Sequence, residues 1–520
     1  MFVFTKLWIV ILCFVQVTIS ARILILCTAP SISHHLFYRK IIRELSLNGH
    51  EVVSITPDPM NDATLTNLTE IDIHNETYGA FSARQILEES KSEPKSIVNM
   101  FRKYLPIAGV ELSHRVLNSS KVKELITNPN EHFDVFINEL FMTNAHFFAF
   151  KEHFNCPAIA ISSVDAVPNV RDAIGNPPHP NYYGSVLIKG GSKLTFWERL
   201  ELLWLNVDFR MYYFWDYLPE ANKIIKKHFK IKTNDAWELE KSVDLVLANA
   251  NPIFNIPQPL VPNYIQIGGY YERKHIPLPQ DLKEFLDNSP NGVVYFSLGS
   301  NIQSGNLPNK IKKSILEAFD QIPYNIIWKF DKENLADISS NVLLKKWLPQ
   351  PDLLDHPNVK AFITHGGIHS VEEAIDSGVP IIGVPFGADQ DFNIYRVVDL
   401  EIGRELQLED ITTESLVKAI TDVVNNPKYK NNIKKLSELN RDQIIKPLDR
   451  AIWWIEYVIR HKGAKQLRSP AADLPWYKFL LLDIIGFVVG TLVLSTIAFI
   501  YLIKIILRLL IFRNLKNKTE

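Results

Sequence analysis

Short apolar runs alternate with helical patterns along most of this 520-residue chain, as in domains built on a parallel β-sheet. The first such unit has a buried strand over residues 22–29, a helix over about 36–47 and a second strand over residues 51–56. The pattern restarts with a strand at residues 292–299 and alternates to about residue 424. We therefore expect two doubly wound α/β domains, with ligands bound in the cleft at the carboxyl ends of the strands.

The boundary between the two halves is expected within residues 251–280, which are rich in proline and include the pair Gly268-Gly269. We place one domain at residues 21–260 and the other at residues 261–470. With 47% hydrophobic residues, a chain of this length can bury two cores. The net charge of −1 gives no electrostatic basis for binding nucleic acid, and the three cysteines form no disulfide framework or metal-binding pattern.

The two ends of the chain predict membrane targeting. Residues 1–20 combine Lys6, an uncharged stretch and a small-residue exit, which favours a cleaved signal peptide over an uncleaved anchor. Residues 484–503 carry no charge and precede a basic end, so a transmembrane helix is expected over residues 479–503, with a cytosolic tail at 504–520. The rest of the chain would then lie in the lumen.

Two further features agree with a location in the endoplasmic reticulum membrane. Lys516 and Lys518 resemble a lysine-based retrieval signal at the carboxyl terminus. Sequons at Asn67, Asn75 and Asn118 would face the lumen and could carry glycans. The sequence thus predicts a single-pass membrane glycoprotein with its two domains on the lumenal side.

The densest group of polar candidates lies between Trp347 and Gln390. In this segment, residues 359–364 form a predicted buried strand, His365-Gly366-Gly367 a turn, and residues 368–377 a helix. The free N–H groups and the dipole of a helix that begins just after a strand favour a bound anion, and two glycines let a diphosphate approach the backbone. The segment therefore predicts a phosphate site.

Side chains around this turn suit the other parts of a nucleotide-sugar. His365 and Ser370 can donate to phosphate oxygens, and Glu373 can accept from ribose hydroxyls. Each residue type also has an ordinary structural interpretation when taken singly, and it is their joint order that is specific. The remaining candidates are Trp347 for stacking on a base, Gln350 for a pyrimidine edge, and Asp389 with Gln390 for sugar hydroxyls.

This segment resembles the signature of the UDP-glycosyltransferases, a family that includes plant transferases and the membrane-bound glucuronosyl- and glucosyltransferases of animals. The resemblance runs from W-x-P-Q at Trp347 through T-H-G-G to the closing Asp389-Gln390. It implies a GT-B architecture in which the first half binds the acceptor and the second half binds the UDP-sugar, with Gly367 and Ser300 also at the diphosphate. His369 stands where family members often carry Asn, so this phosphate contact could become pH dependent.

The first half holds the candidates for catalysis. A histidine in Ser33-His34-His35 can accept a proton from an acceptor hydroxyl, although helix capping by Ser33 with two solvated histidines fits the residues equally well. The resemblance implies His34 as the base, with His35 as second choice. Glu139 ends a predicted strand and would orient that imidazole, whereas the competing Asp134 opens the strand; the family usually carries Asp at the position of Glu139.

The resemblance implies an inverting UDP-glycosyltransferase that transfers a hexosyl group, glucose in preference to glucuronate, to hydroxyl groups of small lipophilic acceptors. We expect no metal or other cofactor, because Asp389-Gln390-Asp391 matches the family's sugar-binding pair better than it matches the D-x-D metal motif. A homo- or hetero-oligomer is compatible with the sequence. The departures at Glu139 and His369 leave a second hypothesis, a catalytically silent ligand-binding membrane glycoprotein on the same scaffold.

Residues 194–217 are unusually rich in aromatic side chains. They fit a pair of core helices, and they also fit a surface that contacts the lumenal side of a membrane or lines the acceptor site. The two interpretations differ in whether the rings are buried or exposed.

Overall fold

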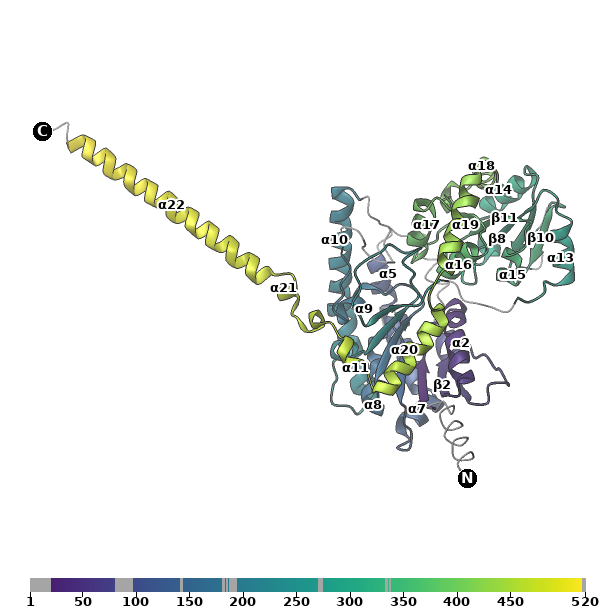
Figure 1. Cartoon of the computed structure of the whole chain (residues 1–520), viewed down its shortest axis with the longest axis horizontal. Coiled ribbons are helices and arrows are strands. Elements are labelled where there is room, and N and C mark those ends of the chain that lie inside the picture. The colour runs from purple at the N-terminus through teal and green to yellow at the C-terminus, as the bar shows by residue number, and fades with distance from the viewer. Residues whose placement is uncertain are drawn as a thin grey trace, which may run out of the picture. The chain divides into compact units, whose positions relative to one another are not determined.

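The structure of the protein is a computed structural model (Figure 1). The chain divides into two units, Met1–Arg468 and Ser469–Glu520. The predicted signal peptide and Lys518 lie outside the described residues, apart from Ser20, and they remain predictions. The structure describes residues 20–79, 97–140, 144–179, 183, 186, 194–269, 275–332, 335 and 338–516.

Among the described residues, seven parallel strands form the sheet of the first half, in the order β3-β2-β1-β4-β5-β6-β7. Because β1 pairs with β2 on one side and with β4 on the other, the strand order reverses at β1, and a ligand site is expected there. The strands are β1 Arg22–Leu26, β2 Glu51–Thr56, β3 Leu68–Asp72, β4 Val135–Glu139, β5 Ala158–Ser162, β6 Leu245–Ala248 and β7 Tyr264–Gln266.

In the described part of the second half, six parallel strands follow the order β10-β9-β8-β11-β12-β13. The reversal now lies between β8 and β11, whose register joins Phe296 to Ile363 and Ser297 to Thr364. The strands are β8 Val293–Ser297, β9 Asn325–Lys329, β10 Val342–Lys345, β11 Val359–Thr364, β12 Ile381–Gly383 and β13 Gly403–Glu405. The two doubly wound halves predicted from the sequence are confirmed.

Helices cover both sheets. Those of the first half are α2 Ile32–Leu47, α3 His74–Thr77, α5 Ile97–Tyr104, η2 Leu105–Glu111, α6 Leu112–Asn118, α7 Ser120–Thr127, η3 Ala145–Phe148, α8 Ala149–Phe154, α9 Pro168–Ala173, α10 Phe196–Met211, η4 Tyr212–Tyr217, α11 Leu218–His228 and α12 Ala236–Lys241. Those that follow are α13 Gln280–Asp287, η5 Ser304–Asn306, α14 Asn309–Asp320, α15 Gln350–Leu354, α16 Ile368–Asp376, α17 Gln390–Asp399, η6 Leu408–Asp410, α18 Thr413–Asn425, α19 Pro427–Arg441, α20 Pro447–His461, η7 Lys465–Leu467, η8 Pro470–Asp473, α21 Trp476–Phe479 and α22 Leu482–Lys516.

Helix α20, the last α-helix described in the large unit, returns to the first half. Figure 1 shows α20 beside α2, and its apolar residues Ile452 and Ile455 share a buried cluster with Ile23 and Ile25 of β1. Strand β7 also belongs to the first sheet, although it lies beyond residue 260. The domain boundaries expected at 260 and 470 are therefore displaced, because the first sheet needs β7 at its edge and α20 on one face.

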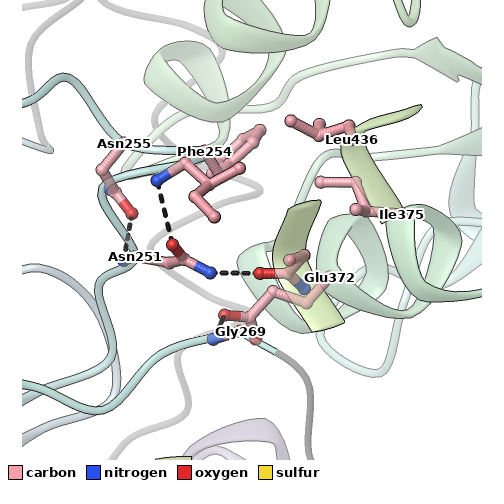
Figure 2. Close-up of a pocket in the computed structure, with 9 residues that line it drawn as sticks. Asn251, Phe254, Asn255, Gly269, Glu372, Ile375 and Leu436 are labelled. Atoms are coloured by element: carbon pink, nitrogen blue, oxygen red, sulfur yellow. Dashed lines mark hydrogen bonds between the residues drawn. The ribbon is translucent and has the colours of Figure 1, made fainter. Parts of the chain in front are cut away.

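A polar junction joins the two halves within the large unit. Figure 2 shows Asn251 at its centre, in a small pocket between the loop after β6 and helices α16 and α19. The Asn251 amide donates to Asn440 Oδ1, and the backbone N–H of Gly269 donates to Glu372 Oε1 at 3.0 Å. None of the nine residues that line this pocket is an expected catalytic or donor-binding residue. The junction therefore connects the halves without belonging to the site.

The small unit contains one long apolar helix. Helix α22 spans Leu482–Lys516, and its apolar part has a mean hydropathy of 2.3 with no buried residues. By length and composition it can cross a membrane. The helix continues past residue 503, so the expected tail from 504 onward is helical as far as Lys516.

Trp328 of β9 lies at the centre of the second half's core. Its fully buried ring stacks on Phe296 at 5.1 Å between centroids and makes an edge contact with Phe330 at 5.0 Å. Its indole Nε1 is buried without a hydrogen-bond partner, which costs part of what the ring contributes to stability. Packing rather than polarity therefore fixes this residue.

We predict that Trp328→Ala lowers the free energy of unfolding by about 3–5 kcal/mol, because it leaves a large cavity. Trp328→Phe should cost less than Trp328→Ala, since it leaves a smaller cavity, keeps a stacked ring and removes the unpaired N–H. Thermal unfolding of the purified full chain in detergent measures both. Equal losses in the two variants would contradict the prediction.

Candidate active site

The catalytic candidates meet where β1 and β4 end. Strand β4 ends at Glu139, and β1 leads through a short loop into α2, which carries His34 in its first turn. The sequence placed His34 in a loop before a helix starting near residue 36, whereas α2 begins at Ile32. Because β1 and β4 are adjacent and parallel, His34 Nδ1 lies 2.5 Å from Glu139 Oε1.

The carboxylate of Glu139 is only 1% exposed, and two further side chains bind it. The hydroxyl of Tyr38 donates to Oε1 at 3.0 Å, and the thiol of Cys27 donates to Oε2 at 3.0 Å. The sequence analysis missed both residues. Tyr38 lies one turn after His34 on α2, and Cys27 follows β1, so the helical spacing and the strand pairing were the signals available.

The pair is electrostatically coupled. Burial opposes a charged imidazole, but the Glu139 charge and hydrogen bond, with the charge of Asp389, prevail and raise the pKa of His34. Burial likewise opposes an ionised carboxylate, but the charge and hydrogen bond of His34 lower the pKa of Glu139 to about 2. Nδ1–H therefore donates to Glu139, and a proton from a substrate must be accepted at Nε2 of His34.

His35 has a different role. Its side chain is buried, its Nε2–H donates to the carbonyl of Ala29 at 2.6 Å, and its Nδ1 lies 3.2 Å from Thr56 Oγ1. Burial lowers the pKa of His35, so its neutral form is favoured. His35 thus fixes the loop before α2, and the geometry supports His34 as the base.

Glu139 and Asp134 lie at opposite ends of β4. Asp134 precedes β4 at the opposite end of the strand, where its carboxylate accepts from the backbone N–H of Arg22 at 2.8 Å. Asp134 is exposed, and it lies at the end of β4 opposite to Glu139, which contacts His34. The geometry supports Glu139 as the orienting carboxylate.

The second half presents the expected glycine turn. Strand β11 ends at Thr364, and α16, nine residues long, begins at Ile368 after Gly367 as its N-cap. Gly366 has a φ of +89°, and a Cβ added there would lie 2.5 Å from Ile394 Cγ1. Only glycine fits this position, and it keeps the first N–H groups of α16 close to the strand end, as an anion site requires.

Three of the predicted donor-binding residues form one hydrogen-bonded group. The Gln350 amide donates to Ser370 Oγ at 3.1 Å and to Glu373 Oε2 at 2.8 Å. The hydroxyl of Tyr295 donates to Gln350 Oε1 at 3.0 Å and so fixes the orientation of that amide. The structure thus brings together the residues expected at the base, the phosphate and the ribose.

Trp347 lies three residues before Gln350 in the chain. The side chain is 64% exposed, and the ammonium of Lys329 lies 4.6 Å from its ring centroid while donating to the carbonyl of Gly299 at 2.9 Å. The sequence analysis did not identify Lys329, because the end of β9 carries no recognisable motif. A cation at this place can contribute to binding an anionic nucleotide.

His365 packs between the two glycine turns. A Cβ on Gly299 would lie 2.5 Å from His365 Cε1, and one on Gly367 would lie 2.7 Å from His365 Nε2. Burial and the charge of Lys329 lower the pKa of His365 to about 4, so the ring is neutral at pH 7 and can donate only one N–H. Ser300 follows Gly299 and is exposed at the same edge.

His369 and Asp389 lie near the first half. The ring of His369 stacks on Phe37 of α2 at 6.0 Å, and its Nδ1 lies 3.6 Å from Glu372 Oε2. Asp389 accepts a hydrogen bond from Asn393 at 2.7 Å. Burial raises the pKa of Asp389, although the charges of His34 and His369 act to lower it. Asp389 is therefore within electrostatic reach of the catalytic candidate His34.

Gln390 is oriented differently from what a sugar-binding role alone would suggest. Its side chain is buried, and its Oε1 accepts from the backbone N–H of Phe386 at 2.9 Å. This bond closes the loop before α17. A sugar would therefore have to be bound through Nε2.

The loops of the two halves also contact each other directly. Asn301, next to Ser300, donates to Ser31 Oγ at 3.0 Å, and Ser31 is the N-cap of the helix that carries His34. Together with the Phe37–His369 stack, this contact brings the end of β1 against the end of β8. The helix that carries His34 therefore contacts both the loop after β8 and the first turn of α16.

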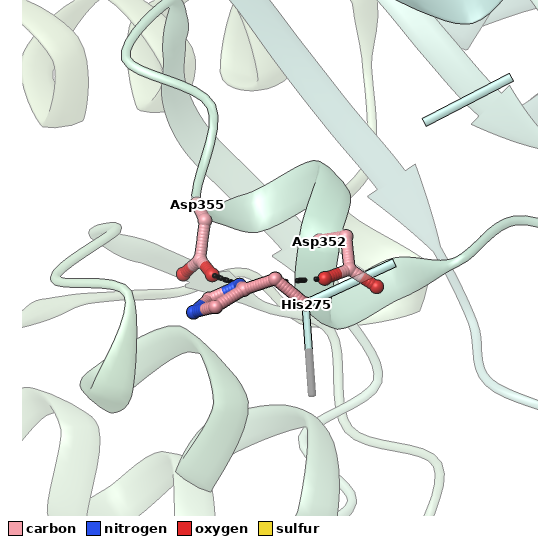
Figure 3. Close-up of side chains that lie close together, drawn as sticks. All are labelled: His275, Asp352 and Asp355. Atoms are coloured by element: carbon pink, nitrogen blue, oxygen red, sulfur yellow. Dashed lines mark ion pairs between the residues drawn. The ribbon is translucent and has the colours of Figure 1, made fainter. Parts of the chain in front are cut away.

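A possible metal cluster lies elsewhere. Among the described residues, the ligand atoms of His275, Asp352 and Asp355 lie within 4.8 Å of one another (Figure 3). His275 is 73% exposed, with Nδ1 at 3.5 Å from Asp352 and 3.3 Å from Asp355, and Asp352 also accepts from the N–H of Ile276. These contacts are those of a surface ion-pair group and do not involve Asp389.

The chain matches the family described as "UDP-glucoronosyl and UDP-glucosyl transferase" over residues 22–518. It belongs to this family. UDP-glucosyltransferase 2 from Dactylopius coccus is 34% identical over 504 residues, covering 95% of this chain and 93% of the relative. UDP-glucuronosyltransferase 2B7 from Homo sapiens is 32% identical over 499 residues, covering 92% and 91%. The chain is therefore a UDP-glycosyltransferase.

Solved structures agree with this assignment at the level of the fold. The glycosyltransferase of kitacinnamycin aligns with a TM-score of 0.57 at 18% identity, covering 84% of this chain and 99% of that one. The glycosyltransferase VinC in complex with DTDP aligns at 0.55 and 17% identity, covering 85% and 100%. The GT-B architecture expected for this UDP-glycosyltransferase is confirmed.

The His34–Glu139 pair predicts a specific pH dependence. A base must be neutral to accept a proton, so kcat/KM should fall as the pH drops through a pKa above 6.5. In Glu139→Gln the carboxylate charge is lost, so burial determines the pKa of His34 and lowers it. The acidic limb of the pH profile should therefore move to lower pH. The plateau should fall by about 10²–10⁴, because the amide no longer stabilises the imidazolium.

Initial rates between pH 5 and 9 test this, with Glu139→Asp as the charge-retaining control. Glu139→Asp should keep the acidic limb above 6.5 even where its plateau is reduced by the shorter side chain. An unchanged acidic limb in Glu139→Gln would contradict the assignment.

Proposed function

We propose that this UDP-glycosyltransferase inverts the anomeric carbon of a UDP-hexose while transferring the sugar to a hydroxyl group of a small lipophilic acceptor. The observation that carries the proposal is the 2.5 Å contact between His34 Nδ1 and the buried carboxylate of Glu139. This contact leaves Nε2 to take the acceptor's proton. The side chain of His34 is 21% exposed, which is enough for a substrate to reach it.

The reaction is a single displacement. The acceptor oxygen forms its bond to the anomeric carbon with its own electron pair while its proton passes to Nε2 of His34. The bond from that carbon to the diphosphate oxygen breaks, and UDP leaves with the bonding electrons. Attack from the face opposite UDP inverts the configuration, and Glu139 stabilises the imidazolium that forms.

In this proposal the second half binds UDP and stabilises it as it leaves. The N–H groups at the start of α16, with His365, Ser370 and Ser300, would bind the diphosphate, where negative charge builds up. Glu373 would accept from the ribose, and Trp347 would stack on the uracil. The Gln350 hydrogen bonds to Ser370 and Glu373 support this arrangement, since they hold the three side chains in fixed positions.

Glucose is the donor we favour, with glucuronate as the alternative. The relatives named for glucosyl transfer include one from Dactylopius coccus and the "Ecdysteroid UDP-glucosyltransferase" of Spodoptera littoralis nuclear polyhedrosis virus, 32% identical over 490 residues. The second name also supports a steroid-like acceptor. Relatives named for glucuronosyl transfer are equally similar, for example UDP-glucuronosyltransferase 2B33 from Macaca mulatta at 32%.

We further propose an endoplasmic reticulum membrane location with the large unit in the lumen, anchored by α22. The length and hydropathy of α22 support the anchor. Of the three sequons, Asn75 and Asn118 are exposed and could carry glycans. Asn67 instead uses its amide to donate to the carbonyls of Ser46 and His50 at 2.8 and 2.6 Å, bonds that a glycan would disturb.

Transfer to a phenolic or steroidal acceptor from UDP-glucose and UDP-glucuronate, followed by product chromatography, tests the proposal. Wild-type protein should glycosylate at least one acceptor, with UDP-glucose preferred. His34→Ala should lower kcat by about 10²–10⁴ and leave UDP affinity within about twofold, because the base is lost but the anion site is not.

His132→Ala, which removes an exposed histidine of the same half, is the matched control and should retain full activity. Transfer by His34→Ala at the wild-type rate would exclude His34 as the base. UDP binding without transfer by wild-type protein would favour the silent ligand-binding protein instead.

A further inference from the structure

Polar side chains stand in a row at the carboxyl ends of three neighbouring strands of the first sheet. Glu139 ends β4, Ser163 follows β5 and Asn249 follows β6, and these strands pair in parallel. All three residues are buried, with exposed fractions of 1% to 2%. Most buried polar groups in folded proteins are hydrogen-bonded, so the partners of Ser163 and Asn249 indicate what the row connects.

Ser163 contacts the proposed base. Its Oγ lies 2.9 Å from Nδ1 of His34, the ring nitrogen whose N–H donates to Glu139. Ser163 therefore gives this N–H a second acceptor oxygen. Because Ser163 follows β5 and Glu139 ends β4, the imidazole is held from two adjacent strands as well as by the helix that carries it.

Asn249 joins Ser163 to the second half. Its Nδ2 donates to the carbonyl of Ser163 at 3.1 Å and to Oε2 of Glu372, on α16, at 3.4 Å. Among the described residues, Oδ1 of Asn249 is buried without a hydrogen-bond partner. Turning the amide over would put this oxygen against two other acceptors, so the two donated bonds define the orientation of Asn249.

Glu372 is bound by two donors of the first half. Besides Asn249, the backbone N–H of Gly269 donates to Oε1 at 3.0 Å, so each carboxylate oxygen has its own partner. The carboxylate also lies 3.6 Å from Nδ1 of His369, in the first turn of α16. Glu372 immediately precedes Glu373, the residue proposed to bind the ribose. The helix expected to hold the donor is thus bound to the first half at Glu372.

A continuous series of contacts therefore runs from the base to the donor helix. It passes from His34 through Ser163 and Asn249 to Glu372. In a direct displacement, the oxygen that gives up its proton must also approach the anomeric carbon, so the base on one half and the donor on the other must be correctly spaced. A misplacement of about 1 Å can lower the rate by about 10². Residues that fix the contact between the halves can thus control the rate.

We propose that Asn249 and Glu372 are positioning residues for the transfer reaction. Their bonds to Ser163 and Gly269 set the spacing between His34 and a UDP-sugar held at α16. They act on kcat, through the residues that they bind, and not on the affinity for UDP. This role rests on the proposed function, because it requires His34 to be the base.

Asn249→Asp tests this role in the full chain, because it removes the amide donor and puts a second carboxylate against Glu372. We expect kcat to fall by about 10- to 100-fold, with the Kd for UDP within about twofold of wild type. In Asn249→Asp/Glu372→Gln, the new amide can donate to the new carboxylate while its oxygen still accepts from Gly269. This double variant should raise kcat at least about fivefold above that of Asn249→Asp.

Asn130→Asp, the same substitution at an exposed residue of the first half, is the matched control and should keep the wild-type kcat. Wild-type kcat in Asn249→Asp would overturn the proposal. Equal losses in Asn249→Asp and the double variant would also overturn it, because they are expected if Asn249 only stabilises the first half. A loss of UDP affinity as large as the loss of kcat would overturn it too. If Asn249→Asp does not fold, Glu372→Ala removes the bonds from the other half and carries the same expectations.

The spacing of the halves can be measured without any transfer. Spin labels on Lys121→Cys of α7 and Lys310→Cys of α14, both exposed positions, report the distance between the halves by double electron–electron resonance. The native cysteines among the described residues are buried. With UDP bound, the distance distribution should be narrow in wild type, broader in Asn249→Asp and narrow again in the double variant.

Equal widths in all three proteins would overturn the proposal even where wild-type protein transfers sugar. The expected widths without any transfer by wild-type protein would instead contradict the proposed function, on which the kinetic role depends.

Discussion

A carboxylate buried at the end of a strand is the constraint on which the catalytic half depends. Glu139 is almost fully buried, and an ionised group there is tolerable only if its oxygens are hydrogen-bonded and its charge is paired. His34, Tyr38 and Cys27 meet that requirement. Because His34 and Tyr38 lie on α2 and Cys27 follows β1, satisfying the carboxylate also fixes the start of α2. The imidazole is thereby oriented before any substrate arrives.

The second half has the features expected of a site that accepts negative charge. Glycines at 299, 366 and 367 keep the backbone close to the strand ends, and His365 fills the space between them. The ring stays neutral there, so its N–H can donate without forming a fixed ion pair with a phosphate. Contacts such as Asn301 with Ser31 then join this site to the helix that carries His34. In the proposed mechanism, proton removal and charge acceptance therefore belong to separate halves of the large unit.

The sequence was sufficient for those parts of the site that depend on local order. The strand, glycine pair and helix around residues 359–376 could be predicted because each element follows directly along the chain. The pairing of His34 with Glu139 could be predicted only through the family resemblance, since the two residues are 105 positions apart. Their meeting depends on β1 and β4 being neighbours in the sheet.

What the sequence could not show are contacts that depend on side-chain direction. Nothing local indicates that Lys329 lies over Trp347, or that the carbonyl of Gln390 turns back to Phe386. The return of α20 to the first sheet was also missed, because its apolar pattern is the same for either half. The aromatic segment at 194–217 was ambiguous for a physical reason: α10 buries one face and exposes the other.

The most direct test of the central claim is the anomeric configuration of the product, read from the proton NMR coupling at the anomeric position. In the proposed mechanism the base and the departing diphosphate act on opposite faces of the sugar, and this arrangement allows only direct displacement. From an α-linked UDP-sugar, the protein should therefore give a β-linked product. An α-linked product would contradict this account, because it would require either a second displacement or attack from the face that UDP occupies.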